Sequence, residues 1–167
     1  MYESIRNAAL FAATATMGLS AGLFYAFACA VMPGLRQTDD RAFVEAMQRI
    51  NVAIQNGWFS IAFGGALIFT VAAVALHLRA DGRSLLPWLV AALVLYGVAL
   101  GITFAVSIPL NDRLEAAGNA ARLPDAALSV ARGQFEAAWV HWNVGRAVAS
   151  TGALACLVWA LMVRGRS

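Results

Sequence analysis

The sequence predicts an all-α integral membrane protein that folds as a four-helix bundle. Of its 167 residues, 61% are hydrophobic and only 13% are charged, and the mean hydropathy is +0.70. Soluble domains carry about 25% charged residues, so this chain has too few of them to cover a water-facing surface. Four long windows contain no charged side chain, and none shows the period-2 alternation of a barrel strand.

The four uncharged windows cover residues 7–35, 50–78, 84–111 and 147–163. A helix that crosses a bilayer needs about 20 apolar residues, so the fourth span must begin before Arg146. We place the membrane spans at residues 8–32, 57–78, 86–108 and 144–163. Pro33 is expected to end the first helix, and Pro109 to end or kink the third, because proline lacks the backbone donor that a helix needs.

Helices two and four are expected to extend beyond the bilayer on the non-cytoplasmic side. Thr38 and the two aspartates after it offer an N-cap and an acidic first turn, and no proline follows them before residue 78. Pro124 and Asp125 start a similar run that can continue into the last span. The chain is therefore interpreted as a single transmembrane domain, residues 1–167, with a polar cap on one side.

The arginines predict which side of the membrane holds the termini. Short cytoplasmic loops of membrane proteins are enriched in Arg and Lys. The two termini and the loop at 79–85 carry two acidic residues, Glu3 and Asp81, and five arginines, namely Arg6, Arg79, Arg83, Arg164 and Arg166. The longer loops of the other face carry arginines that acidic residues balance. Both termini are therefore placed in the cytoplasm, and the protein in a bacterial-type inner membrane.

Several classes of function are excluded. All 12 cationic residues are Arg and are spread along the chain, whereas nucleic-acid binding needs a basic stripe. His77 and His141 lie at opposite ends of two spans, too far apart to share a metal or a haem. Cys29 and Cys156 lack Cys-x-x-Cys spacing, and no phosphate-binding loop or nucleophile elbow is present. We expect no metal site, no cofactor and no nucleic-acid partner.

Polar and aromatic side chains gather at the outer ends of all four spans. Without water, such groups must face another helix or a cavity. Those expected at one depth are Tyr25, Asn51, Gln55, Asn56, Asn111, Asp112, Glu136, Trp139, Asn143 and Arg146. At 100° per residue, an arc of about 80° on the last helix holds Glu136, Trp139, Asn143, Arg146 and Ser150. The group forms either a ligand pocket open to the non-cytoplasmic side or a hydrogen-bonded layer that only locks the bundle.

Arg146 has two alternative roles. It lies about one turn inside the expected membrane boundary, and an arginine at that depth commonly extends its charged end to the interface. Its neighbours on the stripe face inward, however, and a fixed guanidinium there could hold an anionic oxygen with two parallel hydrogen bonds. The sequence leaves both roles open.

Four segments carry a family resemblance. They are Gly22-Leu23-Phe24-Tyr25-Ala26-Phe27, then Phe43-x-x-x-Met47-Gln48-x-Ile50-Asn51 with Asn56 following, then Pro109-Leu110-Asn111-Asp112, and finally Phe135-Glu136-x-x-Trp139-x-x-Trp142-Asn143-x-x-Arg146. In this order they resemble the small anthrone oxygenase-like membrane proteins, a family first catalogued as a domain of unknown function. One departure is Ser107, where the family pattern leads us to expect an asparagine.

The resemblance implies four transmembrane helices and, as in the characterised polyketide-pathway members, cofactor-free oxidation of an anthrone to an anthraquinone. An anthrone has an acidic benzylic C–H, and its enolate can react with O₂ without a metal. Such a reaction needs a base, a stabiliser for the oxyanion and a flat apolar slot. Glu136 is the first candidate for the base and Asp112 the second. The oxyanion would be held by Arg146, Asn143 and Asn111, and the rings by Trp139, Trp142 and Tyr25.

The alternative interpretation is a non-catalytic membrane module. It would be an accessory subunit, or a protein that binds a quinone or a lipid. In both interpretations the expected partners are the lipid bilayer and an aromatic or quinone-like small molecule. A protein partner or a homo-oligomer is compatible with either.

Overall fold

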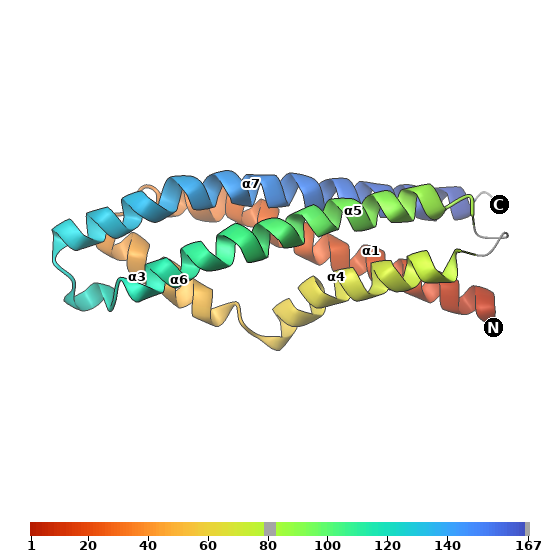
Figure 1. Ribbon diagram of the computed structural model, residues 1–167, viewed down its shortest axis with the longest axis horizontal. Coiled ribbons are helices and arrows are strands. Elements are labelled where there is room, and N and C mark those ends of the chain that lie inside the picture. The colour runs from red at the N-terminus through yellow and green to blue at the C-terminus, as the bar shows by residue number, and fades with distance from the viewer. Residues whose placement is uncertain (79–82, 166–167) are drawn as a thin grey trace.

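The computed structural model describes residues 1–78 and 83–165, which are helical along almost their whole length and contain no strand (Figure 1). Four helical rods are long and apolar enough to cross a membrane: Tyr2–Leu35, Gly57–Leu76, Leu86–Arg122 and Asp125–Arg164. Each rod coincides with one predicted span, so the all-α membrane bundle with four spanning helices is confirmed. Arg79, Asp81 and Arg166, which enter the argument on orientation, lie outside the described residues.

Three of the four sides of the bundle are closely packed. Helix α1 (Tyr2–Ala26) lies against both α4 (Gly57–Leu76) and α7 (Asp125–Arg164), and α7 also packs along α5 (Leu86–Ile102). Small side chains allow this close approach, because fully buried alanines such as Ala13, Ala66, Ala92 and Ala153 occur on all four helices. On the fourth side, α4 and α5 contact each other over a much shorter stretch. We call this side the α4–α5 seam.

The two prolines near the outer ends of the spans each follow a widened helical turn. The π-helical turn η1 (Phe27–Val31) joins α1 to α2 (Met32–Leu35), and η3 (Thr103–Ser107) joins α5 to α6 (Ile108–Ala116). A proline ring would clash with the carbonyl four residues earlier in a regular α-helix, and the wider turn makes room for it. The first helix ends shortly after Pro33, as expected, whereas the third continues through Pro109 to Ala116.

The helix expected to run without a break from Thr38 to residue 78 is interrupted, which corrects that expectation. Helix α3 (Asp40–Ala53) ends and the chain turns at residues 54–56 before α4 begins. Asn56 is the N-cap of α4, and its side-chain oxygen accepts a hydrogen bond from the Phe59 backbone N–H at 3.1 Å. The fourth rod behaves as expected, since α7 is an unbroken helix of 40 residues.

The end of the molecule away from the termini has a core of its own. We call it the cap end; it consists of α2, α3, α6, the 3-10 turn η4 (Ala120–Arg122) and the first turns of α7 (Figure 1). Its core contains Met32, Phe43, Val44, Met47, Leu110, Leu114, Leu128 and Phe135. At the other end, Arg164 hydrogen-bonds Glu3 and Asn7, so the start of α1 and the end of α7 lie side by side.

Arg132 ties the cap to α7. Its guanidinium donates to Glu136 Oε2 at 2.7 Å, to Asp40 Oδ1 at 3.1 Å, and to the backbone carbonyl oxygens of Thr38 and Arg36 at 2.9 Å each. Replacing Arg132 with methionine should therefore lower the free energy of unfolding by about 2–4 kcal/mol, because charge-assisted hydrogen bonds contribute more than neutral ones. Thermal unfolding in detergent micelles measures this loss.

Arg49 provides the matched control for that prediction. Its side chain is 78% exposed and forms an ion pair with Glu45 one turn away on the same helix. An exposed pair of this kind contributes about 0–1 kcal/mol, so Arg49→Met should unfold at nearly the wild-type temperature. Equal effects of the two substitutions would show that the Arg132 network does not hold the cap in place.

Candidate functional site

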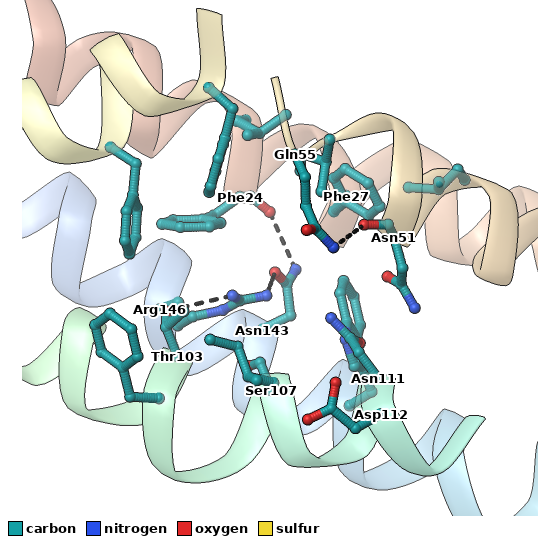
Figure 2. A pocket seen from close by; sticks show the side chains of 18 residues that line it. Phe24, Phe27, Asn51, Gln55, Thr103, Ser107, Asn111, Asp112, Asn143 and Arg146 are labelled. Carbon is teal, nitrogen blue, oxygen red and sulfur yellow. Dashed lines mark hydrogen bonds between the residues drawn. The ribbon is translucent and has the colours of Figure 1, made fainter. Parts of the chain in front are cut away.

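A cavity of about 430 Å³ lies where the cap end meets the spanning helices. Helices from all four rods line it, together with both π-helical turns and the chain turn before α4. Its polar residues are Asn51, Gln55, Thr103, Ser107, Asn111, Asp112, Asn143 and Arg146 (Figure 2). Its aromatic residues are Phe24, Phe27, Phe59, Phe63, Phe104 and Trp139. Apolar walls with a few convergent polar groups are typical of a small-molecule site.

Arg146 occupies the deep end of the cavity. Its side chain is only 6% exposed; Nη2 donates to Asn143 Oδ1 at 2.9 Å, and Nη1 lies 3.4 Å from the Thr103 hydroxyl. The guanidinium carbon lies 4.5 Å from the centre of the Phe24 ring and 5.4 Å from that of Trp139. Within the described part of the chain it forms no ion pair with a carboxylate. Of the two roles that the sequence left open, the inward-facing orientation is the one found.

Three polar atoms around the cavity have no hydrogen-bond partner within the described part of the chain. They are Arg146 Nε, Ser107 Oγ and Asn51 Nδ2, and all three residues line the cavity. A buried polar group without a partner costs about 1–3 kcal/mol, so such groups are rare unless they have a function. An anionic oxygen in the cavity could accept hydrogen bonds from the guanidinium and the hydroxyl. Ser107 therefore keeps a donor at the position where the family pattern predicts an amide.

The amides expected to bind the oxyanion have other partners. Asn143 Nδ2 donates to the Phe24 backbone carbonyl at 3.1 Å while its oxygen accepts from Arg146, so this side chain fixes the guanidinium against α1. Trp139 Nε1 donates to Asn111 Oδ1 at 2.9 Å, which joins α7 to α6. Both asparagines line the cavity, but through these bonds each holds a neighbouring side chain in position: Asn143 holds Arg146, and Asn111 holds Trp139.

Asp112 lies at the opposite end of the cavity from Arg146. In Figure 2 it lies beside Asn111, on the side where Asn51 and Gln55 also lie, whereas Arg146 and Thr103 are at the other side. Its side chain reaches the surface of the protein. Among the described residues that line the cavity, Asp112 is the only one with a carboxylate. The cavity thus pairs one carboxylate at its mouth with one guanidinium at its base.

Glu136 does not reach this cavity, although the sequence placed it on the same stripe. Its Oε2 accepts a hydrogen bond from Arg132 at 2.7 Å, and its Oε1 lies 3.8 Å from Arg36 Nε. It lines a separate groove beside α2. The reason is helix geometry, since Glu136 and Trp139 differ by about 60° around α7 and Arg132 lies one turn before Glu136 on the same face.

Three more residues expected in the pocket lie outside it. Tyr25 is 62% exposed because its neighbour Phe24 takes the inward position on α1. Trp142 is also exposed and packs its ring against His141. Asn56 serves as the cap of α4. The structure does bring together the other predicted residues, namely Asn51, Gln55, Asn111, Asp112, Trp139, Asn143 and Arg146.

The aromatic walls of the cavity could hardly be predicted from the sequence. Four of the wall residues are phenylalanines in apolar spans, namely Phe24, Phe59, Phe63 and Phe104. The sequence pattern does not distinguish a phenylalanine that faces a cavity from one that faces lipid. Thr103 and Ser107 carried a usable signal, because polar residues one turn apart within a span must face inward.

The comparisons with known proteins identify a family. The model of a family described as anthrone oxygenase matches residues 56–156, which is more than half of the chain. The matched region holds α4, α5, η3, α6 and the part of α7 that carries Trp139, Asn143 and Arg146. No curated protein and no solved structure matches this chain.

Proposed function

Because the chain belongs to the anthrone oxygenase family, we propose that it oxidises a lipid-soluble anthrone, or a related hydroxylated aromatic, with O₂ and without a cofactor. The observation that supports this most directly is the buried Arg146, which lines a cavity with aromatic walls and whose Nε has no hydrogen-bond partner among the described residues. This arrangement suits a flat ring system that carries negative charge on one oxygen during the reaction.

In the first step, Asp112 takes a proton from the benzylic carbon of the anthrone. The electron pair of the broken C–H bond passes into the rings, and the charge develops on the carbonyl oxygen. Arg146 Nε and the Ser107 hydroxyl then donate hydrogen bonds to that oxygen, which stabilises the enolate. Phe27 and Trp139, whose ring centres are 5.6 Å apart, provide flat apolar surface beside it.

In the second step, O₂ oxidises the enolate. The benzylic carbon forms a bond to one oxygen atom, and the resulting peroxide anion takes up one proton. Loss of the second benzylic hydrogen as a proton then breaks the O–O bond and releases the distal oxygen as water. The carbon becomes a carbonyl, so one anthrone and one O₂ give one anthraquinone and one water.

We also propose a location for this chemistry. The arginine-rich termini and the loop between α4 and α5 favour a bacterial-type inner membrane with both termini in the cytoplasm. The cavity would then lie near the non-cytoplasmic surface. A lipid-soluble substrate can reach such a site through the bilayer. The bilayer is also one of the partners that we propose for this protein.

The test uses purified protein in detergent with 1,8-dihydroxy-9-anthrone. We expect O₂ uptake and quinone absorbance to rise together, one O₂ per quinone, well above the spontaneous rate and without release of hydrogen peroxide. Quinone formation no faster than in buffer would refute the enzymatic role. Tight binding of the anthrone without turnover would favour the alternative, a membrane module that binds a quinone or a lipid.

A further inference from the structure

Exposed tryptophans mark two levels along the bundle. Trp58 on α4 and Trp142 on α7 lie near the cap end, whereas Trp88 on α5 and Trp159 on α7 contact each other near the other end. Tryptophan side chains concentrate at the two membrane interfaces. Helix α4 rises about 27 Å from Trp58 to Leu76 at 1.5 Å per residue, which matches the ~30 Å thickness of the hydrocarbon core. The acyl chains therefore surround the bundle between these two levels.

The deep end of the cavity lies below the outer of these levels. Arg146 follows Trp142 by one turn of α7, about 6 Å further into the membrane. Thr103 contacts Arg146, so the π-helical turn η3 lies at the same depth. Phe104, the next residue, lines the cavity and is nevertheless 62% exposed. At this depth an exposed side chain faces lipid.

The exposed residues that line the cavity change in chemistry along its length. Towards the membrane they are Phe104 and Ile108, both apolar, which we call the apolar rim. Towards the cap end they are Gln55 and Asp112, both polar, which we call the polar rim. A planar aromatic ligand that is dissolved among acyl chains meets the apolar rim without leaving the hydrocarbon.

The apolar rim lies on the α4–α5 seam, the least packed side of the bundle. The Tyr96 hydroxyl on α5 donates to the Phe63 carbonyl of α4 at 2.8 Å and joins the two helices at that level. Towards the cap end the seam is closed by rings, since Phe63 and Phe104 meet edge to face with centres 6.4 Å apart and Phe59 stacks on Phe63 at 5.1 Å. Ring contacts separate by rotamer changes alone, whereas opening the seam at Tyr96 would also break its hydrogen bond to the Phe63 carbonyl.

We propose that the ligand enters the cavity sideways from the membrane, through the α4–α5 seam, and that Phe104 forms the threshold. The ligand class is an uncharged, planar aromatic molecule that dissolves in the bilayer. The proposal rests on the proposed function for this class of ligand. It concerns the route to the site, so binding alone tests it.

The experiment follows binding of 1,8-dihydroxyanthraquinone to protein in vesicles of phosphatidylcholine and phosphatidylglycerol, using the fluorescence of the probe. A threshold residue sets the barrier to entry, whereas the loss of a wall contact alone would change only dissociation. Because Phe104 also lines the cavity, the association rate is the diagnostic quantity, and Phe104→Ala should raise it about fivefold or more. Gln55→Ala, at the polar rim, should leave the association rate unchanged.

Val98→Ala provides the matched control, because Val98 is an exposed residue of α5 that does not line the cavity. It should not alter either rate. A second probe, phosphatidylcholine with anthracene at the end of one acyl chain, stays in the bilayer and should compete with the first.

Three results would overturn the proposal. They are faster rates in Gln55→Ala but not in Phe104→Ala, failure of the anchored probe to compete, and absence of any binding to the wild-type protein. Binding with the expected kinetics but without turnover of an anthrone would contradict only the proposed function.

Discussion

Replacing Arg146 with methionine should lower kcat for oxidation about a hundredfold or more and leave the protein about as stable as before. The loss of activity follows from the charge that develops on the substrate oxygen, since removal of one oriented donor of this kind lowers kcat by about 10²–10³. Methionine has a similar length and carries no charge. It can fill the space between Phe24 and Trp139 that the guanidinium occupies.

The expectation for stability rests on two opposed effects. Burial of a charge without a counter-ion costs several kcal/mol, and the substitution removes that cost. The substitution also leaves Asn143 Oδ1 without the donor at 2.9 Å, which costs about 1–3 kcal/mol. The net change in the free energy of unfolding should be within about 2 kcal/mol of zero. The thermal unfolding midpoint in detergent and the rate of quinone formation are the two measurements.

Two further variants separate the possible explanations. Arg146→Lys keeps the charge but lacks the Nε–H, so it should restore part of the activity. Arg132→Met should show the reverse pattern, lower stability with turnover retained below the unfolding temperature. A large loss of stability in Arg146→Met would mean that the polar residues around it only lock the bundle, which is the alternative that the sequence left open.

The fold was predictable because one strong constraint determines the membrane spans: each needs about 20 consecutive apolar residues. Long windows without charge located all four rods, and Thr38 with the aspartates after it marked the start of α3. The interruption at residues 54–56 was not predicted, because Asn56 looks like a pocket amide until its bond to the Phe59 N–H identifies it as a helix cap. The π-helical turns were also missed, since no pattern in the sequence records how a helix adapts to Pro33 or Pro109.

The site was predictable only where a polar side chain inside a span had to face the interior of the bundle. Asn143, Arg146 and Trp139 face inward on α7 as their spacing indicated. Glu136 shares their stripe within the tolerance of a helical wheel, but its partners Arg132 and Arg36 decide which way its carboxylate points. The Arg132 contact is an i, i+4 pair within α7, whereas the contact with Arg36 joins distant segments, is set by tertiary structure and cannot be inferred from one helix.

Replacing Asp112 with asparagine should reduce kcat by about 10²–10⁴ and leave Kd for the ligand within about threefold of wild type, because a general base acts in the transition state more than in binding. Asparagine has nearly the same shape as aspartate and cannot accept the benzylic proton. Asp112 is exposed at the cavity mouth and forms no hydrogen bond or ion pair that the structure records within its described residues, so the fold should tolerate the change.

Glu136→Gln is the decisive comparison, because the sequence alone favoured Glu136 as the base. Its carboxylate is engaged by Arg132 and lines a different groove, so this variant should keep kcat within about threefold of wild type while lowering the unfolding temperature. Steady-state rates with 1,8-dihydroxy-9-anthrone for both variants measure the difference. If Glu136→Gln lost activity and Asp112→Asn kept it, the proton would leave through the Arg132 network, and the assignment of the base to the cavity mouth would be wrong.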